Sequence, residues 1–177
     1  SSDLSLGSLF IDNTGALTSW IVDGQQMLQA PLEPYFWKPE NDNQRAAGFA
    51  RRLAKWKDAT KNRTVHAYRA EMDESTLKII YDISLPIGAD LTLTYAITVD
   101  GHIQVSMDYI PNTESSASVG SSDENLMPKF GMRMRIPADY NQIQYYGRGP
   151  WENYPDRKNS AFLGEAKIGR ASCRERV

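Results

Sequence analysis

Residues 91–110 read LTLTYAITVDGHIQVSMDYI, and this stretch decides the fold class. Apolar and polar residues alternate along residues 91–99 and again along residues 102–110, which is the period of a β-strand with one buried face. Asp100-Gly101 between the two runs is a signal for a tight hairpin turn. A slip of one residue would turn each apolar row outward, so the pattern predicts an antiparallel hairpin with a fixed register.

The same strand-and-turn pattern extends along most of the chain. Further strands are expected at residues 8–12, 16–22, 64–72, 77–85, 130–136 and 142–146. Residues 43–60 instead carry Ala, Leu, Lys and Arg at helical spacing, with Phe49, Leu53 and Trp56 on one face. The serine-rich residues 113–125 are expected to form a mobile loop. The sequence therefore predicts an all-β antiparallel sandwich with one short helix.

Composition excludes several classes of protein. The chain has 177 residues, 41% of them hydrophobic, which is enough to bury a core in one domain. The net charge of −2 gives no electrostatic reason to expect nucleic acid. No apolar run approaches the roughly 20 residues that a membrane helix needs. His66 and His102 each stand alone, without partners at ligand spacing, so we expect no metal site.

The C-terminal residues differ from the rest of the chain. Residues 169–177 read GRASCRERV and carry no amphipathic period. They are interpreted as a non-native tail, which leaves residues 1–168 as the domain. The single cysteine, Cys173, lies in this tail and cannot form an internal disulfide, so the fold is expected not to depend on one.

A second informative stretch is YYGRGPWENYPDR, residues 145–157. Strands avoid Gly and Pro, and linkers avoid clustered aromatic residues, so this stretch predicts an ordered loop that leaves a strand. It resembles, almost residue for residue, the G-x-G-P-x-E-x-Y-x-D-R motif in the C-terminal sandwich domain of bacterial β-galactosidases of the lactose-operon type. The motif residues, for which we favour a role in shaping the fold, are Gly147, Arg148, Gly149, Pro150, Glu152, Asn153, Tyr154, Asp156 and Arg157.

A second match to the same family lies at residues 31–43, PLEPYFWKPENDN. Sugars are bound by an aromatic face and by amide and carboxylate hydrogen bonds, so Trp37, Asn41, Asp42 and Asn43 are the candidate substrate-binding residues. Packing of Trp37 in the core is the alternative. The resemblance extends from about Phe10 to about Gly164.

The resemblance implies a fold and an activity. The fold is a truncated antiparallel supersandwich of the galactose mutarotase-like type. The activity is retaining hydrolysis of terminal β-D-galactosides, for which two glutamates must flank the glycosidic bond. In this family those glutamates belong to a barrel domain, and this sequence has no alternating strand and helix units. The carboxylates of Glu40 and Asp42, and of Glu152 and Asp156, are interpreted as turn caps, so no residue here is assigned a catalytic role.

We therefore expect a non-catalytic domain of a β-galactosidase, inactive alone, that shapes the active-site entrance and supports assembly. Its expected partners are galactosides, bound through the parent enzyme, and the other domains of the parent chain. The parent enzymes often use Mg and Na ions, but no cofactor is expected in this chain. A half sandwich leaves sheet edges uncovered, which predicts a homo-oligomer. The expected cellular compartment is either the cytoplasm or the periplasm of a bacterium.

Two other functions remain open. A free-standing carbohydrate-binding module would use the same aromatic loop to bind galactosides. A mutarotase-like epimerase ranks last, because sugar-ring opening needs a general acid and base, typically His with Glu, on one face. Neither histidine of this chain lies in an exposed-loop motif.

Overall fold

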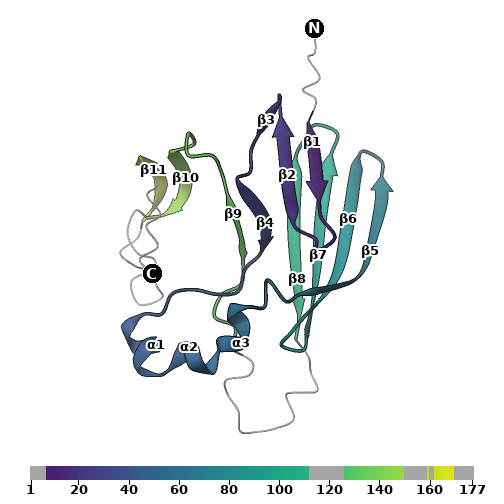
Figure 1. The fold of residues 1–177 in the computed structure, drawn as a ribbon. Helices are drawn as coiled ribbons and strands as arrows, with labels where there is room; N and C mark the ends of the chain where they lie inside the picture. Colours follow the sequence, from purple (N-terminus) through teal and green to yellow (C-terminus); the bar gives the residue numbers. More distant parts are fainter. Residues whose placement is uncertain (1–6, 112–125, 150–158, 160–161, 170–177) are drawn as a thin grey trace. The chain divides into compact units, whose positions relative to one another are not determined.

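The computed structural model describes residues 7–111, 126–149, 159 and 162–169, and the chain divides into two compact units, residues 1–135 and 136–177. The first unit contains two antiparallel sheets and three short helices (Figure 1). The predicted serine-rich loop and residues 170–177 of the predicted tail lie outside the described residues. The all-β antiparallel architecture expected from the sequence is confirmed.

The larger sheet has four strands in sequence order, each antiparallel to the next: β5 (Thr64–Asp73), β6 (Thr76–Leu85), β7 (Ala89–Thr98) and β8 (Ile103–Ile110). The hairpin predicted at residues 91–110 is β7–β8, with Leu91 opposite Tyr109 and Ile97 opposite Ile103. Gly101 in its turn has a φ of +86°, a left-handed conformation that favours glycine. Both arms place their apolar rows on one face, as the alternation predicts.

The other sheet of this unit is built from short strands: β1 (Ser8–Ile11), β2 (Leu17–Val22), β4 (Ala30–Pro34) and β9 (Met132–Arg135), with β3 (Gln25–Gln26) paired to β2. β1, β2 and β9 fall where strands are expected. β4 is not among the strands that the sequence pattern predicts. Its pairing with β9 is irregular between Ala30 and Glu33, and this irregularity accommodates Pro31.

The core lies between these two sheets and is closed by the helical segment. Its fully buried side chains come from both sheets and from the helical segment with the residues before it, and the largest are Trp56, Tyr95, Phe36, Leu53, Ile83, Leu91, Leu93 and Pro34. Gly15, in the β1–β2 turn, sits close enough to the other sheet that a Cβ there would lie 3.3 Å from the Tyr81 ring. The turn is thus packed directly on the larger sheet.

The helix predicted within residues 43–60 is divided into three turns, α1 (Asp42–Ala46), α2 (Phe49–Arg52) and α3 (Ala54–Lys57). Gly48 has a φ of +66°, which ends the first turn and starts the second. The predicted apolar face is still present, because Leu53 and Trp56 are buried and Phe49 is half-buried against the core. A single continuous helix was therefore the wrong expectation. The left-handed Gly48 separates α1 from α2, and Leu53, with a φ of −106°, separates α2 from α3.

The second unit contributes one antiparallel pair, β10 (Gln142–Arg148) and β11 (Leu163–Gly169). β10 was predicted, and it extends two residues further than expected, to Arg148. β11 was not predicted. Among the described residues, no helix is long and apolar enough to cross a membrane.

Candidate functional site

The segment between β4 and α1 places its aromatic side chains in different surroundings. Phe36 is fully buried, with its ring centroid 5.7 Å from that of Trp56. Trp37 is half-buried and packs on Phe49, with the centroids 6.0 Å apart. The ammonium of Lys38 lies over the same Phe49 ring, 5.8 Å from its centroid. Trp37 therefore borders the core and keeps part of its surface in solvent.

The three polar candidates follow at the start of α1. Asn41 caps this helix: its Oδ1 accepts a hydrogen bond from Gln44 N at 2.8 Å, and its own N donates to Gln44 Oε1 at 3.2 Å. This reciprocal pair is a capping box, which fixes the start of a short helix. Asp42 is 98% exposed at its side chain and lies 3.6 Å from an Arg45 nitrogen. Asn43 is exposed.

Local structure thus limits what each candidate offers a ligand. The Asn41 amide is committed to the helix, whereas the Asp42 carboxylate and the Asn43 amide are open to solvent. Together with the exposed part of Trp37 they lie within seven residues of one another along the chain. An aromatic ring can pack on the C–H face of a sugar, and an exposed amide or carboxylate can form hydrogen bonds with the hydroxyl groups of the sugar.

Glu40, next to this group, has a structural role. Its Oε1 accepts a hydrogen bond from the backbone N–H of Ala50, in the first turn of α2. A carboxylate at this position satisfies a backbone donor that the helix leaves without a partner. This contact agrees with the interpretation of Glu40 as a cap, whereas the Asp42 carboxylate lies exposed in the first turn of α1, which is capped by Asn41.

The glycine motif begins in the second unit, at the end of β10. A Cβ at Gly149 would lie 2.2 Å from the Tyr145 hydroxyl, and one at Gly147 would lie 3.5 Å from the same ring. Any side chain at position 149 would therefore displace Tyr145. The rest of the motif, Pro150, Trp151, Glu152, Asn153, Tyr154, Pro155, Asp156 and Arg157, lies outside the described residues.

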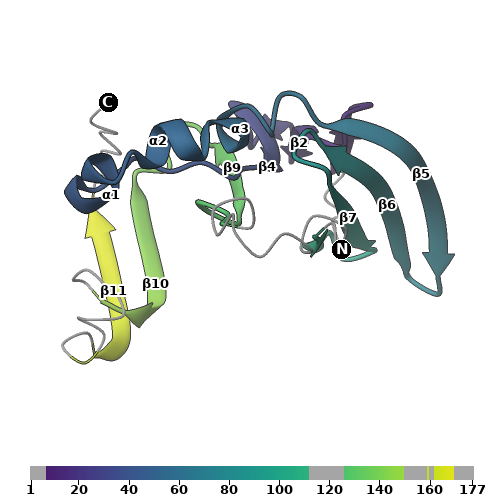
Figure 2. The same cartoon turned by 90° about the horizontal axis from the view of Figure 1, so that it is seen from below.

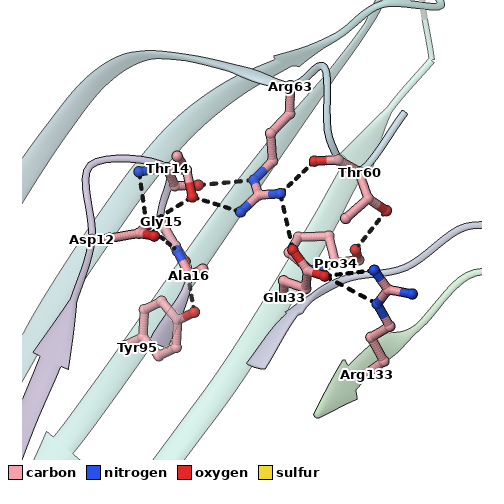
Figure 3. Close-up of polar contacts among 10 residues, drawn as sticks. All are labelled: Asp12, Thr14, Gly15, Ala16, Glu33, Pro34, Thr60, Arg63, Tyr95 and Arg133. Atoms are coloured by element: carbon pink, nitrogen blue, oxygen red, sulfur yellow. Dashed lines mark hydrogen bonds and ion pairs between the residues drawn. The ribbon is translucent and has the colours of Figure 1, made fainter. Parts of the chain in front are cut away.

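A polar cluster that the sequence did not predict is centred on Arg63 (Figure 3). Its guanidinium is only 5% exposed and donates to the carbonyl and hydroxyl oxygens of Thr14 at 2.9 and 2.7 Å, and to the carbonyl of Thr60. It also lies 3.4 Å from Glu33, whose carboxylate accepts two hydrogen bonds from Arg133 at 2.8 and 3.0 Å. Arg63 thus ties the β1–β2 turn to β4 and to the end of the helical segment.

The β1–β2 turn is fixed from its other side by Asp12. Its Oδ1 accepts hydrogen bonds from Thr14 N, Thr14 Oγ1 and Ala16 N at 2.7–3.0 Å. Burial acts to raise the pKa of Asp12, but these hydrogen bonds and the positive charge of Arg63 outweigh it, so the pKa lies below its usual value.

The Tyr95 hydroxyl donates to Gly15 O at 2.8 Å from the facing sheet. Burial, with a smaller contribution from Tyr81, raises the pKa of this phenol. Tyr95 therefore remains neutral and keeps its donor proton over the physiological range.

The described residues do not form a metal-binding cluster. Within residues 7–111, 126–149, 159 and 162–169, no three His, Cys, Asp or Glu side chains converge on a point that can hold a metal ion. His66 bonds to Ser84 at 2.7 Å. His102 lies in the β7–β8 turn, 2.8 Å from Asp100 and with its side chain 82% exposed, so the expectation that neither histidine lies in an exposed loop is wrong for His102.

Comparison with known protein families matches residues 6–167 to the family described as the β-galactosidase small chain. The chain belongs to this family. The matched range includes every candidate residue, from Trp37 to Arg157. The match to the small-chain family covers nearly the whole sequence, including the two motifs that predicted the family.

Several bacterial β-galactosidases are similar to this small-chain member. The enzyme of Lactobacillus delbrueckii subsp. bulgaricus is 32% identical over 143 residues, which are 80% of this chain and 13% of that enzyme. The enzyme of Halalkalibacterium halodurans is 27% identical, over 88% of this chain and 15% of its own length. That of Priestia megaterium is 24% identical, over 96% and 15%. The chain thus spans less than a fifth of the length of these relatives.

Proposed function

We propose that this chain is a non-catalytic domain of a β-galactosidase, the parent enzyme cleaving terminal β-D-galactosides with retention. The observation that carries the proposal is the small-chain match over residues 6–167, in relatives named β-galactosidase of which the chain spans 13–17%. The resemblance further implies the supersandwich fold of galactose mutarotase-like domains. The domain contributes binding surface and support, and the hydrolytic glutamates belong to another part of the parent.

Within this domain, the candidate contact with substrate is the Trp37 loop, residues 37–43. Trp37 is held by Phe49 beside the core but is not fully covered. The capping box of Asn41 fixes the backbone from which Asp42 and Asn43 extend into solvent. A loop that is rigid before the sugar arrives loses little conformational entropy on binding. We propose that it forms part of the wall at the active-site entrance of the parent enzyme.

Two of the described carboxylates, those of Glu33 and Glu40, support the non-catalytic role. A retaining glycosidase holds two carboxyl groups roughly 5 Å apart on either side of the glycosidic bond. Glu40 is bonded to the backbone of α2, and Glu33 is bonded to Arg63 and Arg133. Both carboxylates are engaged in holding the fold, so neither serves as an acid or nucleophile.

The test is hydrolysis of a nitrophenyl β-galactoside by the purified chain, with an intact β-galactosidase as the positive control. We expect no release of nitrophenol above the buffer rate. Sustained turnover that survives repeated purification would contradict the non-catalytic role. Polarimetry of freshly dissolved α-galactose in the same samples tests the epimerase alternative, which requires faster mutarotation than buffer alone.

A further inference from the structure

Among the strands that the structure describes, β5 forms an edge of the larger sheet with no partner on its outer side. Within the described part of the chain, β5 pairs only with β6, and Figure 2 shows it as the outermost strand of this sheet. Nearly all of its residues are exposed, including Tyr68 and Met72, each 74% exposed. An exposed edge with free N–H and C=O groups is a template for pairing with another strand.

Only part of this edge is regular. The register of β5 on β6 shifts between Val65 and Ala67, a β-bulge that bends the strand. From Ala67 to Asp73 the pairing is continuous, opposite Asp82 to Thr76. This regular segment has seven residues, and its centre is Ala70.

The residues on either side of Ala70 have opposite charges. Arg69 and Glu71 lie on one face of the strand, where their side chains approach to 3.4 Å. On the other face Tyr68 stacks on Tyr81, with the centroids 6.1 Å apart, so its ring is held in place. The segment thus carries a self-complementary pattern about its midpoint.

We propose that a second copy of this chain pairs with the first along β5, antiparallel, about a two-fold axis at Ala70. In this register Arg69 lies opposite Glu71 of the second copy, and Glu71 lies opposite the second copy's Arg69. Tyr68 lies opposite Met72 of the second copy on the apolar face, a favourable contact of sulfur with an aromatic ring. The two sheets then form one continuous sheet of eight strands.

Other registers of the same pairing are worse. A centre at Arg69 places the two Arg69 side chains opposite each other, and a centre at Glu71 does the same with the glutamates; like charges directly opposite are destabilising. A slip of a single residue would set the charged row against the apolar row. A centre closer to the N-terminus runs into the bulge at Val65–Ala67.

Mixing two charge variants tests the register. Arg69→Glu alone faces two Glu–Glu contacts in its own dimer, and Glu71→Arg alone faces two Arg–Arg contacts. Mixed in equal amounts, they form a heterodimer in which both contacts are Glu–Arg. We expect each variant alone to dimerise roughly tenfold to a hundredfold more weakly than the wild type, and the mixture to recover dimer in analytical ultracentrifugation.

The matched control is Asp108→Arg, a charge reversal at an exposed position of β8, the strand at the other edge of the sheet. It should leave the dimer unchanged. Arg69→Glu also loses the internal contact with Asp82 at 2.7 Å, so circular dichroism checks its fold. A monomeric wild type at micromolar concentration, or a mixture that stays monomeric while both variants are folded, would overturn the proposal.

A disulfide at the axis gives an independent readout. In a Cys173→Ser background, Ala70→Cys places two thiols directly opposite each other, at a Cα separation that a disulfide can span. Oxidation by glutathione disulfide should link the dimer covalently. Ala67→Cys, whose two copies lie about 20 Å apart in this register, should not link. Equal cross-linking of both variants would contradict the register, and neither variant alters the Trp37 loop.

Discussion

Replacing Arg63 by methionine should destabilise the fold far more than the same change at Arg133. Arg63 is 5% exposed and donates to Thr14, Thr60 and Glu33. Its loss removes this donor from the carbonyl and hydroxyl oxygens of Thr14 and from the carbonyl of Thr60, in a site that water barely reaches. Removing one partner of a buried charged pair costs about 3–5 kcal/mol. Glu33 keeps its two bonds from Arg133, so the lower end, about 3 kcal/mol, is expected.

Arg133 offers a matched comparison, because it binds the same carboxylate from a side chain that is 48% exposed. Exposed ion pairs contribute at most about 1 kcal/mol, and its stacking on Tyr35 at 4.4 Å adds a similar amount at most. The assay is urea unfolding followed by tryptophan fluorescence. A loss of about 3 kcal/mol corresponds to a Tm lower by roughly 6–12 °C in a chain of this size. Equal losses in the two variants would refute the view of Arg63 as the central tie of the first unit.

Three further substitutions test the core packing, the cap of α1 and the pH dependence of the β1–β2 turn. Phe36→Ala removes a fully buried ring that contacts Trp56, and should cost about 3–5 kcal/mol in the same urea assay; a loss under 1 kcal/mol would contradict its place in the core. Asn41→Ala removes the capping box of α1 and should cost about 1 kcal/mol, whereas Asn62→Ala at an exposed position should not change stability. Asp12→Asn tests how stability depends on pH. The pKa of Asp12 in the folded state lies below its ordinary value of 3.8, so the ionised carboxylate stabilises the fold above that pH. This contribution to stability is lost as the pH falls through the lower folded-state pKa. The stability gap between wild type and Asp12→Asn should therefore be largest near neutral pH and shrink in acid; a constant gap would exclude this linkage.

Local patterns were sufficient to predict most of the strands. The β7–β8 hairpin follows from alternation of apolar and polar residues and from an Asp-Gly turn, which are properties of neighbouring residues. β11 was missed because residues 163–169 read LGEAKIG, in which glycine at two positions weakens the strand signal. The helix was predicted as continuous because one glycine in a helical pattern does not reveal its backbone conformation, and Gly48 adopts a left-handed one.

The polar cluster could not be predicted for a different reason. Arg63 contacts Thr14, 49 residues earlier, and Glu33, 30 residues earlier. Such contacts depend on how the two sheets pack, and no spacing along the chain encodes them. The candidate sugar contacts were selected by residue type. Trp37 and residues 41–43 are close only along the chain, with Trp37 before α1 and Asp42 and Asn43 in its first turn.

The most direct test of the sugar-contacting loop is an NMR titration of the chain with galactose and lactose. It is repeated on Trp37→Ala, on Asn43→Ala, and on Trp20→Ala as a control that also loses a partly buried tryptophan packed on the core. We expect saturable shifts in the wild type and in folded Trp20→Ala, their loss in folded Trp37→Ala, and weaker binding by Asn43→Ala. Flat spectra in the wild type, or unchanged shifts in Trp37→Ala, would contradict a sugar contact at this loop.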